Sequence, residues 1–365
     1  MKHIIVLLTL ILLASSCHVG RFFLWNFADI RDHNKFASVP VNNNQESHYQ
    51  FYESSKKLEP DNFVIKGKEL SFEQGLKKEG TVAFLVIQND SVIYEKYFAD
   101  YDSSSVVPSF SVAKSYTSAL LGIAIDEGFI KSVDDVITEY IPTLPQEPYG
   151  KITLRHLLDM RSGLRFNESY INPFGHVAKS YYGTNLKKFT VELKSHFPAG
   201  TDFEYISVNT QLLGWAIQNA TGKQLSVYLE EKIWKPLGME FPASWSIDSK
   251  KHKTEKAFCC INACARDYAK FGRLYLTKGN WNGKQIVSEK WVTESLDFDE
   301  TRFYSYQWWR RPRNEIDQTD FYANGFLGQY IYVNPKKNLI IVRLGKKDGD
   351  IYWPKVFQKI SDKCD

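Results

Sequence analysis

The chain has 365 residues, of which 43% are hydrophobic and 24% charged, as in ordinary folded globular proteins. These proportions exclude a disordered or fibrous chain, and the length suits about two domains. The 46 basic and 42 acidic side chains are mixed along the sequence. The resulting net charge of +4 gives no reason to expect a nucleic-acid partner.

Residues 1–17 have the order of an export signal. A basic start precedes an apolar run from 4 to 14, and small residues then lead to Cys17. The run is shorter than the ~20 apolar residues that a membrane-spanning helix needs. A cysteine after small residues resembles a bacterial lipobox, although Leu13 stands one position too far from it. We expect export to the bacterial cell envelope, with Cys17 as the lipid attachment site. The alternatives are a cleaved signal without lipid and a retained membrane anchor.

Strand and helix patterns begin after an N-terminal arm over residues 18–61, which we expect to lie on the protein body or on the membrane surface. A short helix is predicted over 72–78. Two apolar strands at 81–88 and 91–98 flank an Asn-Asp pair, which is typical of a hairpin turn. These segments predict an antiparallel hairpin with a helix before it.

Helical periodicity dominates the middle of the chain. A long apolar helix is predicted from Ser111 to Gly128, because apolar residues recur at helical spacing and glycine ends the pattern. The clearest helices after it cover residues 154–160, 211–220, 225–233 and 265–276. The chain then returns to strands at 328–333 and 339–344, before a closing helix at 353–360.

This order of elements predicts an α+β fold. An antiparallel sheet built from both chain ends, residues 62–128 and 300–365, is expected to pack against helices. Residues 129–299 are expected to form a mostly helical inserted domain. The interface between the two domains is the expected place for an active site.

A pair of chemically reactive residues opens the long apolar helix. Ser111 and Lys114 are three residues apart, so both side chains lie on one helix face and the amine can reach the hydroxyl. A neutral lysine can then deprotonate the serine, and backbone N–H groups at the helix start favour negative charge. A second pair with this spacing, Ser54 and Lys57, stands in a polar stretch without an apolar helix behind it.

Further motifs follow the serine in a definite order. They are I-T-L-R-H-L-L-D-M-R-S-G from Ile152, Y-I-S-V-N from Tyr205, A-R-D-Y-A-K-F-G from Ala265, and A-N-G-F-L-G-Q from Ala323. This series resembles the class C β-lactamase-like serine hydrolases of the penicillin-recognising superfamily, over about residues 64 to 360. The resemblance implies the β-lactamase/transpeptidase-like fold and no cofactor or metal.

The resemblance also implies roles for particular residues. Ser111 is the nucleophile that becomes acylated, Lys114 activates it, and Tyr205 shuttles the proton. The backbone N–H groups of Ser111 and Phe326 are implied to form the oxyanion hole. A tyrosine beside a lysine ammonium is expected to be partly deprotonated, and so to serve as base and then acid.

Two motifs depart from the family pattern. The tyrosine motif has Ser207 where asparagine is usual, and Asn209 is a candidate substitute for it or a helix cap. The strand motif has Ala323 where β-lactamases carry lysine, so the cation for a substrate carboxylate is missing, and Arg310 and Arg311 are the nearest candidate replacements in sequence. Gly325 still lets the strand approach closely.

These departures look most like the 6-aminohexanoate-dimer hydrolase branch, whose members act on small amides and carboxyl esters. Trp308 and Trp309 are candidates for walls of the acyl pocket, with the protein core as their alternative position. Ser207, Asn209, Ala323 and Gly325 are the other candidate substrate-binding residues. The expected partner is a small amide or ester. The alternatives are a D-alanyl-D-alanine carboxypeptidase or β-lactamase, and a catalytically silent ligand-binding protein.

Three cysteines cluster late in the chain, at Cys259, Cys260 and Cys264. No histidine stands at zinc-finger spacing from them, and adjacent cysteines do not form the usual disulfide framework. We expect them to be small buried side chains.

Overall fold

The computed structural model describes residues 18–25, 27–298, 303–311 and 319–364. The predicted signal segment and Cys17 therefore lie outside the described residues. Within the described part of the chain, no helix has both the length and the apolar character required to cross a bilayer.

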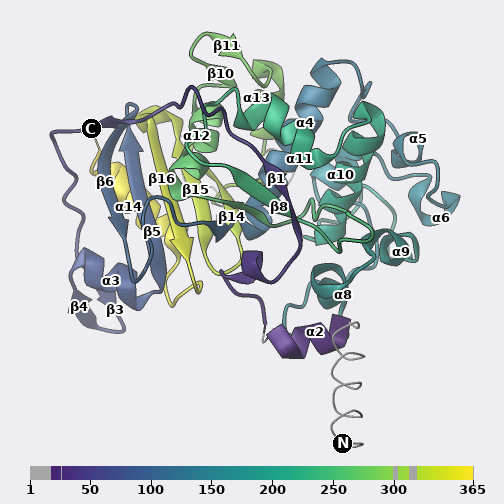
Figure 1. The fold of residues 1–365 in the computed structure, drawn as a ribbon, viewed down its shortest axis with the longest axis horizontal. Helices are drawn as coiled ribbons and strands as arrows, with labels where there is room; N and C mark the ends of the chain where they lie inside the picture. The colour runs from purple at the N-terminus through teal and green to yellow at the C-terminus, as the bar shows by residue number, and fades with distance from the viewer. Residues whose placement is uncertain (1–17, 26, 299–302, 312–318, 365) are drawn as a thin grey trace, which may run out of the picture.

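An eight-stranded sheet combines the two ends of the chain, as Figure 1 shows. Its strands, in spatial order, are β12 (Tyr304–Ser305), β13 (Trp308–Trp309), β14 (Phe321–Gly325), β15 (Gln329–Asn334), β16 (Leu339–Gly345), β5 (Thr81–Gln88), β6 (Ser91–Tyr97) and β2 (Tyr52–Glu53). All neighbours from β12 to β6 pair antiparallel, and β2 joins parallel at the edge. The predicted α+β class with a sheet from both chain ends is confirmed.

The predicted hairpin forms as expected. Strands β5 and β6 are antiparallel, and Asn89 and Asp90 between them have φ values of 50° and 59°. Positive φ at both central positions is the geometry of a two-residue type I′ turn. Strand β5 is buried on both faces because helices cover the sheet on both sides.

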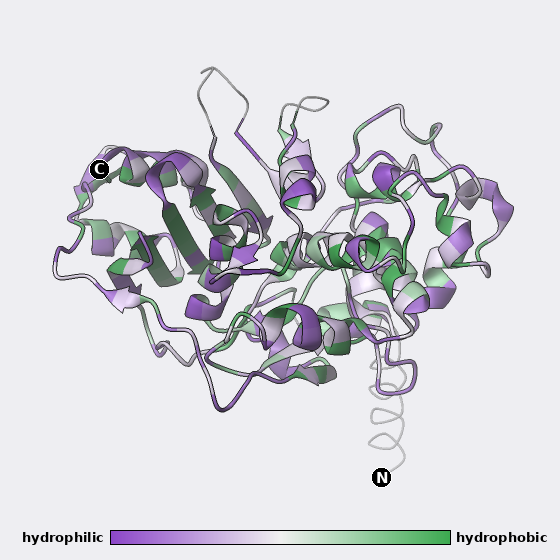
Figure 2. Cartoon of the chain, turned by 90° about the horizontal axis from the view of Figure 1, so that it is seen from above, coloured by the Kyte–Doolittle hydropathy of each residue, from purple (hydrophilic) through white to green (hydrophobic). Residues whose placement is uncertain are grey.

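Alternating residues of the central strands pack into two separate hydrophobic cores. Ala83 and Leu85 of β5 face the main core, whereas Phe84 and Val86 face a smaller one. Helices α3 (Phe72–Lys78) and α14 (Trp353–Asp362) cover the smaller core. The hydropathy colouring in Figure 2 shows the strands of this sheet in green.

Helix α12 (Ala265–Leu276) departs from the predicted domain division. It falls within the range expected for the helical domain, but it packs against β5, β15 and β16. The contact is close, because a Cβ added to Gly272 would lie 2.8 Å from Ile331 Cγ2. The sheet face is apolar and α12 covers it, although α12 begins 177 positions after the end of β5 in the sequence.

The helical part of the molecule is centred on α4 (Ala113–Asp126) and α10 (Ser207–Thr221), which pack against each other. Around them lie α5 (Ile137–Tyr140), α6 (Gln146–Tyr149), α7 (Leu154–Leu158), α8 (His176–Tyr182), α9 (Leu186–Val191), α11 (Leu225–Leu229) with a π-helical turn (Glu230–Trp234), and α13 (Glu289–Ser295). The predicted helix from Ser111 begins instead with a 3₁₀ turn over Phe110–Val112.

The N-terminal arm lies along the protein body. It contains α2 (His18–Trp25) and a 3₁₀ turn at Asp32–Asn34, and its strand β1 (Ser38–Val41) opens a second sheet in the order β1-β8-β9-β7. The partners are β8 (Ala243–Ser246), β9 (Ile261–Ala263) and β7 (Val107–Pro108). Two small hairpins complete the strands, β3 (Phe63–Ile65) with β4 (Lys68–Leu70), and β10 (Asn280–Trp281) with β11 (Lys284–Gln285). The arm is thereby tied to segments on both sides of Ser111.

Candidate active site

The backbone around Ser111 is held in an unusual conformation. Phe110 has φ of 43°, a region that bulky residues rarely adopt and that is found at functional sites. Ser109 fixes the approach to this turn, since its N–H donates to Ile261 O at 2.7 Å and its Oγ accepts from Ile261 N at 3.1 Å. Strand β9 therefore sets the position from which Ser111 projects.

The amine of Lys114 is buried at the centre of the site. Its Nζ donates to Ser111 Oγ at 3.0 Å, to Ser207 Oγ at 3.2 Å and to the carbonyl oxygen of Phe258 at 2.9 Å. Burial lowers the pKa of Lys114 from 10.5 to about 8, and the nearby carboxylate of Glu168 opposes this shift. About a tenth of the amine is therefore neutral at pH 7, and a neutral amine at this distance can accept the serine proton.

Tyr205 also forms a hydrogen bond with the side chain of Ser111. The Lys114 Nζ lies 5.1 Å from the centre of the Tyr205 ring, which in turn lies 5.2 Å from the ring of Trp309. Desolvation raises the pKa of Tyr205, and a hydrogen bond with Ser111 only partly opposes that shift. The expectation of a partly deprotonated tyrosine is therefore not supported: burial, and after it the negative charge of Glu168, raise the pKa of Tyr205 and favour the neutral phenol.

The substitution of Ser207 for asparagine is accompanied by a carboxylate that the sequence analysis missed. Glu168 accepts hydrogen bonds from Ser207 N at 2.9 Å and from Ser207 Oγ at 2.6 Å, at the first residue of α10. A carboxylate at a helix N-terminus satisfies free N–H groups there. Glu168 thus aligns the serine that contacts Lys114. No local motif marks this residue, which lies 39 positions before Ser207.

Two candidate substrate-binding residues lie outside the site. Asn209 is fully buried, where its side chain accepts from Ser162 Oγ at 2.6 Å and contacts the sulfur of Met160. It joins α10 to the loop after α7, and its side chain does not cap the helix. Ala323 is buried in the main core. The methyl group of alanine offers no charge at the position where β-lactamases carry lysine.

Gly325 brings strand β14 against the nucleophile. A Cβ at this position would lie 2.4 Å from the carbonyl oxygen of Ser109 and 3.2 Å from the backbone nitrogen of Ser111. Only glycine permits that approach. The next residue, Phe326, is held by Gln329, whose Nε2 donates to the Phe326 carbonyl at 3.1 Å. The backbone of residues 325–326 therefore lies beside the Ser111 N–H, as a two-donor oxyanion hole requires.

The loop behind this strand is fixed by a buried cation that sequence analysis did not identify. The guanidinium of Arg343 donates to the carbonyl oxygens of Gly328 and Glu79 at 2.6 and 2.8 Å. Burial lowers the pKa of Arg343 to about 9. These bonds connect the end of the Phe326 loop to the start of β5, so Arg343 positions the loop without contacting the site.

The paired tryptophans have different surroundings. Trp309 packs on Tyr205, so it borders the site. Trp308 is fully buried and packs on Phe271, Tyr275 and Phe321 in the core, so its predicted place in the acyl pocket is wrong. Because neighbouring residues of a strand point to opposite faces, only one of the pair can face the site.

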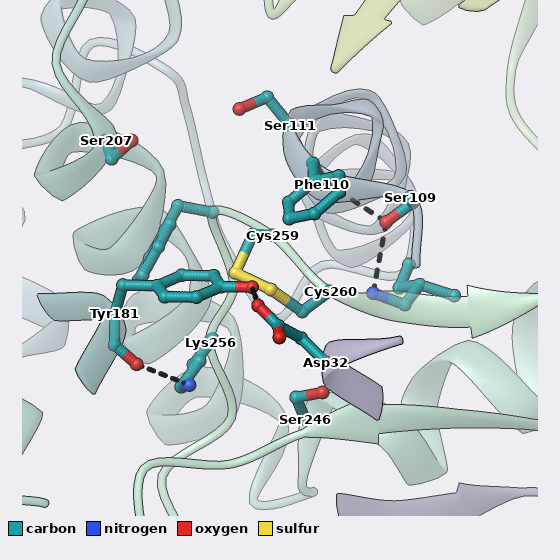
Figure 3. Close-up of a disulfide and its surroundings, with 12 residues drawn as sticks. Asp32, Ser109, Phe110, Ser111, Tyr181, Ser207, Ser246, Lys256, Cys259 and Cys260 are labelled. Atoms are coloured by element: carbon teal, nitrogen blue, oxygen red, sulfur yellow. Dashed lines mark hydrogen bonds between the residues drawn. A yellow bond between two sulfur atoms is a disulfide. The ribbon is translucent and has the colours of Figure 1, made fainter. Parts of the chain in front are cut away.

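Cys259 and Cys260 are buried as expected, but they form a disulfide between adjacent residues, which the sequence analysis did not predict. The spacing of cysteines in a sequence indicates disulfides that close loops between distant residues. This bond joins neighbours, so the spacing did not predict it. Figure 3 shows the disulfide between Phe110 and Tyr181, with Ser111 close by. It directly follows Phe258, whose carbonyl holds Lys114. Cys264 is a buried free thiol, as expected.

Comparisons with known proteins agree with this geometry. Residues 71–351 match the family described as Beta-lactamase. The chain is 27% identical over 310 residues to the 6-aminohexanoate-dimer hydrolase of Paenarthrobacter ureafaciens, covering 77% of this chain and 75% of the relative.

Solved structures show the same fold. A candidate 6-aminohexanoate-dimer hydrolase from Bacillus anthracis aligns with a TM-score of 0.81 at 27% identity, covering 93% of this chain and 92% of its own. A class C beta-lactamase aligns with a TM-score of 0.64 at 16% identity, over 80% of this chain and 94% of its own. The chain thus belongs to the beta-lactamase family of serine hydrolases.

Proposed function

We propose that this protein cleaves a small amide or carboxyl ester through an acyl-enzyme on Ser111. The observation that carries the proposal is the 3.0 Å contact between Ser111 Oγ and a buried Lys114 amine whose pKa is lowered to about 8. The similarity to a relative named 6-aminohexanoate-dimer hydrolase supports an acyl-transfer reaction.

In the acylation step, neutral Lys114 takes the hydroxyl proton as Ser111 Oγ attacks the carbonyl carbon. The carbonyl electrons move onto oxygen, and the N–H groups of Ser111 and Phe326 stabilise the charge that develops there. Collapse of this intermediate expels the leaving group. The Tyr205 phenol supplies its proton, and the Lys114 ammonium returns one to Tyr205. Water then attacks the acyl-enzyme by the same route, giving the carboxylic acid and free Ser111.

Among the described residues, the strand beside Ser111 carries no lysine that could bind a substrate carboxylate next to the scissile bond. Ala323 replaces the lysine, and both nearby arginines are engaged elsewhere. Arg310 stacks on Phe298 at 4.3 Å, while Arg311 donates to Gln358 at 2.6 Å. This arrangement favours neutral esters and amides over β-lactams and D-alanyl-D-alanine peptides.

Ser111→Ala should reduce ester hydrolysis to a few per cent of the wild-type rate or less, because the variant cannot form the acyl-enzyme. Turnover of p-nitrophenyl butyrate by purified protein measures this loss. Ser54→Ala is the matched control, since it removes the serine of the other S-x-x-K sequence, whose Lys57 pairs with Glu53. Equal loss in both variants, or retained activity in Ser111→Ala, would contradict the assignment and favour a silent binding protein.

The rate of ester hydrolysis should rise with pH through about 8 and then level off. Lys114 acts in its neutral form, which predominates above its pKa of about 8. Glu168→Gln should move the midpoint to lower pH, because the carboxylate that stabilises the ammonium is removed. The pH profile of kcat/KM measures both effects, with Glu139→Gln as an exposed control. An unchanged midpoint in Glu168→Gln would argue against this electrostatic coupling.

Nitrocefin should be a poorer substrate than p-nitrophenyl butyrate. A charge-assisted hydrogen bond contributes about 1.5–3 kcal/mol, so its absence should weaken β-lactam turnover by roughly ten- to a hundredfold. Neutral esters do not need the cation. The measurement is kcat/KM for nitrocefin divided by kcat/KM for p-nitrophenyl butyrate. A ratio above one would contradict this prediction and place the protein with the β-lactamases.

We further propose that the protein is exported and lipid-anchored through Cys17. Several acyl chains hold a protein firmly on a membrane, whereas one chain binds reversibly. Wild-type protein should therefore partition into the detergent phase of a membrane fraction, and Cys17→Ser should lose both processing and this partition. Cys364→Ser serves as the control. Unchanged processing and membrane association in Cys17→Ser would favour an uncleaved anchor.

A further inference from the structure

An apolar cavity of about 330 Å³ opens at Ser111. Its walls come from several separate parts of the chain, among them Phe22 and Phe27 of the N-terminal arm, Ala178 and Tyr181 of α8, and Phe258 with Cys259. Figure 3 shows Tyr181 and the Cys259–Cys260 disulfide on the same side of Phe110. At this size the cavity stands at the lower end of the range for small-molecule sites, ~300–1,000 Å³.

The described residues that line this cavity include no charged side chain. The hydroxyl of Tyr181 is occupied, because it donates to Asp32 Oδ2 at 2.7 Å. That of Tyr170 donates to Glu168 at 3.0 Å. A charged group placed among these walls would lose its hydration without gaining a partner, which is strongly unfavourable.

The position of Tyr205 indicates which half of a substrate this cavity holds. Tyr205 protonates the leaving group in the proposed mechanism, so the leaving group must lie on the Tyr205 side. Tyr205 packs against Trp309 and Tyr304, and none of these three residues lines the cavity. The cavity therefore lies on the side of Ser111 that keeps the acyl group.

We infer that this cavity is an acyl-binding subsite for uncharged aliphatic chains, so that the substrates are esters or amides of neutral, short to medium acyl groups. The inference rests on the proposed function and names its substrate class. It differs from what the name of the 27%-identical relative implies, since a 6-aminohexanoyl group carries an ammonium at the end of its acyl chain.

The N-terminal arm is part of this subsite. Phe22 is buried against the ring of Tyr182 at 5.4 Å, while Phe27 is 48% exposed and stands at the entrance. Ile171, which also lines the cavity, is 78% exposed. The entrance is thus apolar as well, which suits a hydrocarbon chain that extends beyond the cavity.

The decisive comparison uses two esters that differ only at the chain end, p-nitrophenyl hexanoate and p-nitrophenyl 6-aminohexanoate, with purified wild-type protein. We expect kcat/KM to favour the hexanoate by more than about tenfold, because the ammonium has no partner in the cavity. Across acetate, butyrate and hexanoate, kcat/KM should rise by up to about fourfold for each methylene that is buried.

Two variants test the cavity itself. Val177→Asp introduces a carboxylate into the wall and should shift the preference towards the 6-aminohexanoate ester by at least tenfold. Ile171→Asp introduces a carboxylate at an exposed lining position, where it should not disturb folding. It should shift the preference in the same direction by a smaller factor. Val227→Asp is the control, since Val227 is exposed on α11 and does not line the cavity.

The outcomes separate this inference from the proposed function. Turnover that depends on Ser111, with the 6-aminohexanoate ester equal to or better than the hexanoate, would overturn the acyl subsite and leave the hydrolase intact. The same holds if Ile171→Asp and Val227→Asp behave alike. Absence of any turnover that depends on Ser111, with every ester in the series, would overturn both.

Discussion

Burial of the Lys114 amine is the constraint on which the candidate site depends. An ammonium group in this position is poorly solvated, so its pKa falls to about 8 and a useful fraction is neutral near physiological pH. The hydroxyls of Ser111 and Ser207 and the carbonyl of Phe258 hold the nitrogen in place. These groups come from three segments that are distant in sequence and pack together around the nitrogen.

Burial also gives Lys114 and Tyr205 different roles in proton transfer. A lysine of which a fraction is neutral near pH 7 can act as base, whereas the raised pKa of Tyr205 keeps that residue protonated and able to donate. Glu168 moderates the arrangement, since its negative charge opposes the loss of the lysine charge. Environments that push two pKa values in opposite directions are a common way to assign acid and base roles at neutral pH.

The backbone contributes as much to the site as the side chains do. Gly325 allows β14 to approach Ser109 and Ser111, and Gln329 and Arg343 fix the loop that carries Phe326. On the opposite side, Phe22 and Phe27 of the N-terminal arm close an apolar space next to Ser111. The N-terminal arm thereby lines the cavity that opens at Ser111.

The sequence by itself determined the elements and the reactive pair. The hairpin at 81–98, the apolar helix after Ser111 and the strands near the chain end follow from local periodicity, and the spacing of Ser111 and Lys114 follows from helix geometry. Tertiary structure alone decided that Glu168 aligns Ser207, that Asn209 and Trp308 belong to the core, and that Cys259 bonds to Cys260. The physical reason is that each of these positions depends on which distant segment packs against it, and local pattern carries no information about that partner.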